Sequence, residues 1–501
     1  MKRFLSIVLS IIMVFLLLSC ERSGPDNPSD VTTSDSGSSS ALKTLTDGAV
    51  YRIVTPSMDR LEYAIKGNDF CSYDGVQCNV SPYKGVLSSL WKVKFTGDED
   101  NSIMLESVAT CERYLMVSKY SESGDPVTVR ASIDSDFTGQ KFIPVLNDNG
   151  YYVLKSTVTM RVISIAETTS GATVISEDEN GSLLQAWNFI KTADPDKEIP
   201  TLLPVTGGIP HSSTPEIISD GTNYYMCVMT GGVAIKKSKD LRYWTYIGDA
   251  FGRTDKNFPF DWMEEEVPNY ALWSPGIYEM NGKYYLYYSL STLGSQHSAI
   301  GVAVNETLDY NSKQYMWVDK GVVLHSYVGD DFNAIDPNVI TDQDGISWLV
   351  YGSYWSGIQM RRLDPDTGYL DENYPEVYYL ASIQGIEAPY IIYREGYYYL
   401  FCATNIGEYD NRVGRSENIT GPYVNRDGLS MRTGNSELVT KNTENIKSCA
   451  HNAVFQDNDG QWYMVGEYST SGADYSLFLI STIVWTEDGW PTTALTPGLF
   501  K

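Results

Sequence analysis

The sequence predicts an all-β protein in which a five-bladed β-propeller occupies residues 205–501. One formula of strand, glycine turn and aromatic strand recurs five times in that half, at intervals of roughly 50 to 65 residues, as the blades of a propeller do. A different pattern recurs three times earlier in the chain. Tyrosine, which favours strands, accounts for 37 of the 501 residues. Because a chain of this length exceeds one typical core, the two sets of repeats predict two domains.

The first 19 residues have the layout of a secretory signal peptide. Lys2 and Arg3 precede an apolar run from Phe4 to Leu18, which is short for a membrane-spanning helix. The ending Leu-Leu-Ser-Cys resembles a lipobox, which implies that Cys20 carries a lipid and becomes the new N-terminus. We therefore expect an exported protein, anchored by lipid to the cell envelope at the periplasmic or surface face of the outer membrane.

Residues 20–41 contain mostly Ser, Asp, Gly and Pro, with few apolar side chains to bury. Such a composition predicts a disordered linker behind the lipidated cysteine. The whole chain has a formal charge of -26, which argues against nucleic acid or anionic lipid surfaces as partners, because both require a basic surface. A neutral polysaccharide or oligosaccharide is compatible with this charge, and we expect a monomer.

Residues 42–192 predict a domain of three similar units, with a period of roughly 45 to 50 residues. Each unit opens with an apolar strand and closes with an aromatic residue in a short strand. The three closing residues are Trp91, Phe142 and Trp187, the last within a Q-x-W sequence. These closings resemble those of ricin-B-type lectin domains, which implies a β-trefoil with these aromatic residues in its core. The stretch Arg113–Val117 lacks the early Asp of the sugar-binding repeats, so a structural trefoil and a working lectin both stay open.

The stretch ADPDKEIPTLLP, near Thr192–Pro204, predicts a linker to the second domain. From residue 205 onward, each repeat begins with a small or polar residue, which Pro usually follows. An apolar strand, a turn with Gly and an aromatic strand come next. The five repeats start at Thr214, Ser274, Asp336, Ala388 and His451. Each predicts a β-hairpin, and the intervals leave room for two further strands, which completes a blade. A proline at the start of a strand removes no ladder hydrogen bond.

Equivalent strand starts converge on the axis of a propeller, so these positions predict one axial funnel. Asp336, Glu387 and His451 would meet there. Buried carboxylates are unfavourable without compensation, and their clustering therefore favours a functional site over a plain core.

Longer stretches around these residues strengthen the functional interpretation. They are Trp-Ser-Pro at 273–275, Phe-Asn-Ala-Ile-Asp-Pro-Asn-Val at 332–339, Gly-Ser-Tyr-Trp-Ser-Gly-Ile at 352–358, Ile-Glu-Ala-Pro-Tyr-Ile at 386–391, Arg-Val-Gly-Arg-Ser at 412–416 and His-Asn-Ala-Val at 451–454. Together they resemble the endo-1,5-α-L-arabinanases of glycoside hydrolase family 43, from about Pro210 to the C-terminus.

The resemblance implies an inverting hydrolase of α-L-arabinofuranosyl linkages that needs no cofactor for its chemistry. Glu387 would be the general acid, which requires a pKa lifted toward neutrality. Asp336 would lift that pKa by its negative charge and orient the acid. His451 matches a histidine that holds an ion or waters, so a structural Ca²⁺ could lie near it.

The resemblance also implies four residues that bind the substrate. Trp273 and Trp355 would stack on sugar rings, and Asn333 and Ser356 lie in the matching motifs. Packing within the blades is the alternative role for the two tryptophans.

Thr214 departs from the family pattern, because it stands where an Asp would act as the general base. Threonine cannot accept a proton at neutral pH. Glu216, two residues further on the same expected strand face, could replace that Asp, and so could a loop carboxylate from Glu264–Glu266. Otherwise the chain is a catalytically impaired relative that binds glycans. A different specificity, such as that of a galactanase or β-xylosidase, also stays open.

Overall fold

Strands dominate the computed structural model, which describes residues 44–58, 63–67, 75–110, 112–131, 137–405, 408–443, 446–469 and 476–499. The signal peptide, the lipobox cysteine and the linker expected at residues 1–41 lie outside this part of the chain. In the described part, no helix is both long and apolar enough to cross a membrane.

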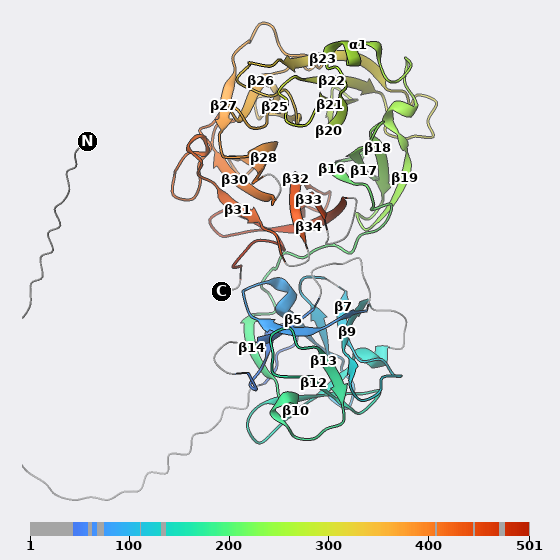
Figure 1. The fold of residues 1–501 in the computed structure, drawn as a ribbon, viewed down its shortest axis with the longest axis vertical. Helices are drawn as coiled ribbons and strands as arrows, with labels where there is room; N and C mark the ends of the chain where they lie inside the picture. Colours follow the sequence, from blue (N-terminus) through green and yellow to red (C-terminus); the bar gives the residue numbers. More distant parts are fainter. Residues whose placement is uncertain are drawn as a thin grey trace, which may run out of the picture. The chain divides into compact units, whose positions relative to one another are not determined.

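Five antiparallel sheets follow one another along the second half of the chain, as the labels β16 to β34 show around the ring in Figure 1. The strands of the first two sheets are β16 (Ser213–Ser219), β17 (Tyr224–Met229), β18 (Ala234–Ser238), β19 (Tyr243–Asp249), β20 (Ala271–Met280), β21 (Lys283–Ser291), β22 (Ser298–Asn305) and β23 (Val318–Ser326). The others are β24 (Asn338–Thr341), β25 (Ser347–Tyr351), β26 (Ile358–Arg362), β27 (Tyr378–Ala381), β28 (Glu387–Arg394), β29 (Tyr397–Thr404), β30 (Asp410–Ser416), β31 (Glu437–Thr440), β32 (Lys447–Gln456), β33 (Trp462–Ser469), β34 (Leu477–Trp485) and β35 (Pro491–Thr492). This arrangement confirms the predicted five-bladed propeller.

Short elements connect and extend the blades. The strand β15 (Thr206–Gly207) pairs with β19 in parallel. The helix α1 (Asp261–Glu266) and the 3₁₀ turns η4 (Ala250–Gly252) and η5 (Met431–Thr433) lie in loops between strands. The first strand of each blade contacts the first strands of its two neighbours, in the closed order β16, β20, β24, β28, β32 and back to β16. The five first strands therefore surround the axis.

Each blade enters its first strand through a residue with a left-handed backbone. These residues are Thr214 (φ 48°), Ser274 (φ 40°), Asp336 (φ 58°), Ala388 (φ 51°) and His451 (φ 45°). Positive φ is uncommon for residues other than glycine, and five equivalent cases indicate a built-in feature of the blade. In four of the five blades the pairing register also shifts at this point. Such a bulge re-aims a side chain, and here it turns the strand start toward the axis.

The segment before the first blade joins the last one. Leu203 donates its backbone N–H to Ile480 at 2.8 Å, and Thr482 donates to Thr201 at 2.9 Å. Leu203 also packs in one cluster with Trp244 of the first blade and Phe478 of the last. The end of the expected linker is therefore bonded to β34 and helps to close the ring.

The N-terminal half forms a separate set of strands. They are β1 (Val50–Thr55), β2 (Tyr63–Lys66), β3 (Val76–Gln77), β4 (Asn79–Pro82), β5 (Leu90–Phe95), β6 (Ile103–Ser107), β7 (Arg113–Met116), β8 (Asp125–Pro126), β9 (Thr128–Ala131), β10 (Phe142–Leu146), β11 (Tyr152–Ser156), β12 (Val162–Ile165), β13 (Val174–Glu177) and β14 (Asn188–Ala193). Three 3₁₀ turns, η1 (Leu87–Ser89), η2 (Phe137–Gln140) and η3 (Leu183–Gln185), precede β5, β10 and β14.

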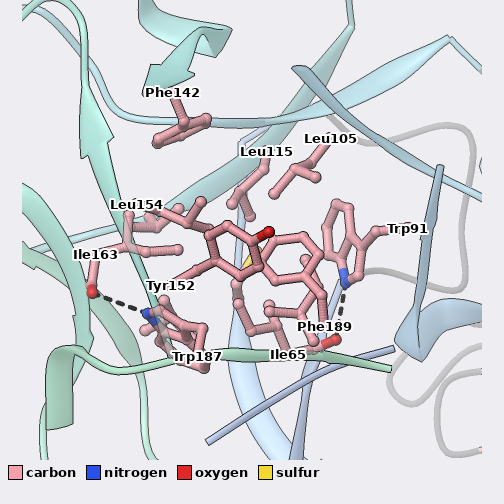
Figure 2. Close-up of a cluster of buried hydrophobic side chains, with 14 of the residues drawn as sticks. Ile65, Trp91, Leu105, Leu115, Phe142, Tyr152, Leu154, Ile163, Trp187 and Phe189 are labelled. Carbon is pink, nitrogen blue, oxygen red and sulfur yellow. Dashed lines mark hydrogen bonds between the residues drawn. The ribbon is translucent and has the colours of Figure 1, made fainter. Parts of the chain in front are cut away.

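Three aromatic side chains occupy equivalent places in the core of this half. Trp91, Phe142 and Trp187 are fully buried, and each follows one of the three 3₁₀ turns. The indole N–H of Trp91 donates to Ile65 O at 3.0 Å, and that of Trp187 donates to Ile163 O at 3.0 Å, as the dashed lines in Figure 2 show. The same contact thus recurs in the first and third repeats, which agrees with a threefold pattern. The β-trefoil itself stays a prediction.

Candidate active site

A cavity of about 810 Å³ opens where the strand starts meet the axis of the propeller. Its walls include side chains from all five blades: Thr214, Ser274, Asp336, Glu387 and His451. Four of these are the left-handed strand starts, and Glu387 immediately precedes the fifth. The structure therefore brings Asp336, Glu387 and His451 together, as their equivalent positions in the repeats predict.

Asp336 is the most enclosed carboxylate of the cavity, with 5% of its surface exposed. Its Oδ2 accepts the backbone N–H of Ala388 at 3.0 Å, and Ser274 donates a side-chain hydrogen bond to it. Its own backbone N–H donates to the Ser289 hydroxyl at 3.0 Å. These contacts to the two neighbouring blades fix the carboxylate firmly.

Glu387 lies at the start of β28 and is also buried. Its Oε2 accepts the Ser353 hydroxyl at 3.3 Å, and its Oε1 lies 3.3 Å from Nε2 of His451. The Tyr409 hydroxyl also donates to this carboxylate. Three donors from different elements therefore orient Glu387.

The charges in this cluster set its protonation. Burial opposes the imidazolium form of His451, but Asp336 and the hydrogen bond to Glu387 outweigh it and raise the pKa of His451 to about 10. Burial and the charge of Glu387 raise the pKa of Asp336, against the opposing effect of His451. Burial also favours protonated Glu387, yet the hydrogen bond and charge of His451 dominate and lower the pKa of Glu387. The sequence predicted a raised pKa for Glu387, and the imidazolium beside it is the reason for the difference.

The same three residues could hold a divalent cation. Asp336, Glu387 and His451 each offer one ligand atom, and these atoms all lie within 4.8 Å of one another. Two carboxylate oxygens and one imidazole nitrogen are common ligands of divalent cations. A protonated imidazole has no lone pair to donate, so a cation and the proton on His451 exclude each other. A bound cation would supply the positive charge that the imidazolium otherwise provides.

A third acidic residue, Glu467 of β33, also lines the cavity. Its Oε2 accepts the backbone N–H of Thr214 at 3.0 Å and the hydroxyl of Ser213. The carboxylate of the last blade is thus bound to the strand start of the first blade. The Thr214 hydroxyl beside it is buried and has no hydrogen-bond partner among the described residues.

Aromatic side chains form one wall of the cavity. Trp273 is half-buried, whereas Tyr354 and Trp355 expose 47% and 43% of their surfaces. Tyr354 and Trp355 both have left-handed backbones, in a tight loop between Gly352 and Gly357. Flat apolar rings that stay half-exposed beside polar groups suit the apolar face of a sugar.

Asn333 and Ser356, the two polar residues expected to bind substrate, occupy different places. Asn333 lines the cavity, and its buried Oδ1 has no hydrogen-bond partner in the described part of the chain. Ser356 does not belong to the cavity wall. Its hydroxyl accepts a hydrogen bond from Gln359 at 2.7 Å, and its N–H donates to Asp331 O at 2.8 Å, because the loop turns back after Trp355. Ser353 of the same loop lines the cavity instead.

Glu216, the carboxylate expected to replace the missing base, does not line the cavity that contains Glu387. It borders a much smaller axial space of about 30 Å³, which Thr214, Asp336 and His451 also line. Burial raises the pKa of Glu216 well above its usual value, although the Ile277 N–H donates to it. A carboxyl group that keeps its proton is a poor base, which disfavours Glu216 in this role.

The three acidic residues proposed as a loop source of the base lie on α1 and outside the cavity wall. Glu264 accepts the N–H of Asn269, and Glu266 accepts from Tyr327 and lies 2.8 Å from Nδ1 of His325. Glu264 is therefore engaged within its own loop, and Glu266 at the end of β23.

Several wall residues carry no marker in the sequence, among them Ser213, Leu293, Tyr409 and Glu467. Glu467 could have been found from the register of its hairpin. The turn after Gln456 joins β32 to β33, and counting outward from it places Glu467 opposite His451, which one bulge shifts to Ala450 in the structure. A residue opposite a strand start therefore belongs near the funnel, although it follows no proline.

Comparison with known proteins gives one matching family and many relatives. The model of the family described as "Glycosyl hydrolases family 43" matches residues 209–491. The extracellular exo-α-(1→5)-L-arabinofuranosidase of Cellvibrio japonicus is 32% identical over 299 residues, which cover 55% of this chain and 84% of the relative. The extracellular endo-α-(1→5)-L-arabinanase 1 of Bacillus subtilis is 32% identical over 292 residues, which cover 56% of this chain and 86% of the relative.

Solved structures match the same region. An exo-1,5-α-L-arabinanase from a bovine ruminal metagenomic library is 34% identical with a TM-score of 0.54, covering 58% of this chain and 98% of its own. The α-L-arabinanase of Cellvibrio cellulosa, in complex with arabinohexaose, is 31% identical with a TM-score of 0.54, covering 57% of this chain and 96% of its own. The family match begins after β14, so it contains the five blades and excludes the strands β1 to β14.

Proposed function

The chain belongs to glycosyl hydrolases family 43, and from this premise we propose that it hydrolyses α-L-arabinofuranosyl linkages of arabinan or a related plant polysaccharide. Inversion at the anomeric carbon is the stereochemical course that we propose. The relatives at 32% identity are named as an α-(1→5)-L-arabinofuranosidase and an α-(1→5)-L-arabinanase, and a related structure contains arabinohexaose. The observation that carries the proposal is the cavity in which Glu387, Asp336 and the half-exposed Trp355 lie together.

Glu387 is the proposed general acid, which protonates the glycosidic oxygen as the bond to the anomeric carbon breaks. Its carboxylate is fixed by Ser353, Tyr409 and His451. Nε2 of His451 lies 3.3 Å from Oε1, so a proton source contacts the acid directly. Asp336 orients the cluster through its contacts to Ser274 and Ala388.

The remaining wall residues bind the sugar. Trp273 and Trp355 offer ring faces, and the unpartnered Oδ1 of Asn333 can accept a sugar hydroxyl. Hydrolysis requires only side-chain proton transfers and water, so the chemistry needs no cofactor. A structural Ca²⁺ ion near His451 would have to leave Glu387 free, because a carboxylate bound to the ion cannot hold the proton of the general acid.

Product analysis with purified full-length protein tests the function. Debranched arabinan is incubated with the wild type, and released products are separated by chromatography while NMR follows the anomer that forms first. We expect arabinose or arabino-oligosaccharides with inverted configuration. Galactan and xylan serve as parallel substrates, and release of sugars from one of these alone would replace arabinan as the substrate.

Glu387→Gln tests the acid. We expect hydrolysis of arabinan to fall about 10²- to 10⁴-fold, because the variant cannot deliver the proton. An aryl arabinofuranoside with a good leaving group needs little protonation and should lose much less. Glu395→Gln, in the turn at the other end of the same strand, is the matched control and should keep wild-type rates. Equal losses on both substrates would contradict an acid role.

A second candidate, a glycan-binding protein that cuts nothing, is favoured by one observation: Thr214 stands at the strand start of the first blade, and a hydroxyl cannot act as a base there. Binding of arabinan without any product, over long incubation with the wild type, is the result that would establish it.

For the N-terminal half, residues 42–192, we propose a β-trefoil domain of the ricin-B type. The repeated Trp91 and Trp187 contacts support it. Gln185 accepts the N–H groups of Asn180 and Gly181 and donates to Asp178 O, so the glutamine of the Q-x-W sequence has a structural role. A crystal structure with three equivalent four-stranded units would establish the trefoil.

We further propose that the protein is exported and anchored by lipid at Cys20. Three relatives are named extracellular, which supports export. Labelling with a palmitate analogue, in wild type and in Cys20→Ala, tests the anchor: only the wild type should take up label and remain with the membrane fraction. Size-exclusion chromatography of the released protein tests the expected monomer.

A further inference from the structure

An inverting hydrolase needs a base that deprotonates the attacking water, and the first blade offers only Thr214 at the expected position. Its hydroxyl is buried without a hydrogen-bond partner among the described residues. The backbone there has the same left-handed turn as the other four strand starts. The blade is therefore built as usual, and only the carboxylate is missing from it.

The carboxylate of Glu467 fills the space beside this position. It arrives from β33, the second strand of the last blade, and its Oε2 is held by Thr214 N–H at 3.0 Å and by the Ser213 hydroxyl. Both donors belong to the start of β16 in the first blade. A carboxylate thus stands in front of Thr214 although the first blade does not supply it.

The free oxygen of this carboxylate is placed for chemistry. Both hydrogen bonds from the first blade go to Oε2, and within the described part of the chain Oε1 has no hydrogen-bond partner. Glu467 lines the same cavity as Glu387 and Asp336. Oε1 is therefore available to accept a proton from a water molecule in the cavity.

The ring order of the blades separates this carboxylate from the acid. Glu467 is bound at the start of β16, Glu387 is at the start of β28, and β32 with His451 contacts both of these strands. Glu467 is not part of the group whose ligand atoms lie within 4.8 Å of one another. Inverting enzymes keep their acid and base roughly 6.5 to 9.5 Å apart, because a water must fit between the base and the sugar.

We propose that Glu467 is the general base of this hydrolase, which rests on the proposed function. Oε1 of Glu467 takes a proton from water while the water oxygen bonds to the anomeric carbon. The glycosidic C–O bond breaks, and the leaving oxygen takes a proton from Glu387, which the imidazolium of His451 supplies across their 3.3 Å contact. Glu467 ends protonated and His451 neutral, and exchange of a proton with solvent restores both.

The first test is Glu467→Gln in the full-length protein. The amide oxygen of Gln can still accept from Thr214 N–H, so the anchor is retained, but an amide cannot take the proton. We expect kcat on debranched arabinan to fall about 10²- to 10⁴-fold. Unlike the loss in Glu387→Gln, this loss should persist on an aryl arabinofuranoside, because attack by water stays slow whatever the leaving group. Glu279→Gln, an exposed glutamate on β20, is the matched control.

The second test does not depend on a perfectly folded Gln variant. In Glu467→Ala, the removed side chain leaves room for azide, which needs no base. Sodium azide should then restore turnover of the aryl substrate and give β-L-arabinofuranosyl azide, the inverted product. A misfolded variant would not be rescued by azide.

Three results would overturn the assignment. They are wild-type-like kcat in Glu467→Gln, a loss that a good leaving group repairs, and a loss in Glu216→Gln that exceeds the loss in Glu467→Gln. Failure of the proposed function looks different, because the wild type itself would then release nothing from arabinan. If the wild type cuts another glycan, the same variants are assayed on that glycan. If it cuts none, the base assignment falls with the function.

Discussion

Trp355 exposes 43% of its surface beside the carboxylates, although tryptophan is usually well buried. Its neighbour Tyr354 meets it edge-on, with ring centroids 6.2 Å apart. More than two fifths of the surface of Trp355 is therefore available to a ligand. This arrangement favours a role in binding over one in blade packing.

Trp355→Ala should weaken arabino-oligosaccharide binding on the order of tenfold, which corresponds to about 1.4 kcal/mol. The melting temperature should hardly change, since exposed side chains contribute little to stability. Calorimetric titration with Glu387→Gln as the inactive background measures the affinity. Tyr246→Ala, which removes a comparably exposed ring outside the cavity wall, is the control. A fall in melting temperature with unchanged affinity would assign Trp355 to packing.

Single residues of the site were predictable to different degrees. Asp336 directly precedes a proline that marks a strand start and Glu387 lies two residues before one, so the repeats point to both. Glu467 lies inside a strand without such a marker, and only the hairpin register places it at the funnel. Glu216 was assigned to the face of Thr214 by simple alternation along the strand. The register shift between Ser213 and Glu216 breaks that alternation, which is why Glu216 does not reach the cavity.

The loop from Gly352 to Gly357 carries Ser353, Tyr354 and Trp355 into the site. Both glycines have positive φ, and each passes close to another backbone. A Cβ on Gly352 would lie 2.4 Å from Gly357 O, and one on Gly357 would lie 2.1 Å from Ala381 O. The sequence motif predicted a binding loop here, but not that Ser356 turns away from the cavity, since this depends on its bond to Gln359.

Gly357→Ala should move this loop and impair the site. We expect a stability loss of about 1–3 kcal/mol from the strained backbone and the clash, together with lower affinity for arabino-oligosaccharides. Gly345→Ala in the same blade is the control, because Gly345 has a similar φ of 80° but open space around a Cβ. Urea unfolding and ligand titration of both variants separate strain from clash. Identical behaviour of the two variants would show that the contact with Ala381 has no effect.

At the scale of the whole propeller, the number of blades followed from the repeats, whereas ring closure did not. Five copies of one hairpin formula predict five blades because each sheet must bury its faces against neighbouring sheets. The chain before the first blade has no such formula and was expected to be a linker. Its hydrogen bonds to Ile480 and Thr482 are long-range contacts, which no local pattern encodes.

The inner part of the propeller contains buried thiols that should make it sensitive to alkali. Burial raises the pKa of Cys402 to about 12, despite the nearby Arg412, and burial with the charge of Glu216 raises that of Cys227 further. Above the ordinary thiol pKa the unfolded chain therefore loses protons that the folded protein keeps, so its stability falls as pH rises, by roughly 1.4 kcal/mol per pH unit for each thiol. Lys236 acts oppositely, because burial lowers its pKa to about 8 and the folded state then releases its proton first.

Two thiols outweigh one lysine, so urea unfolding under reducing conditions should show a lower free energy of unfolding at pH 10 than at pH 8.5. Cys402→Ala should make this decline shallower, and an unchanged or rising free energy in the wild type would contradict the prediction.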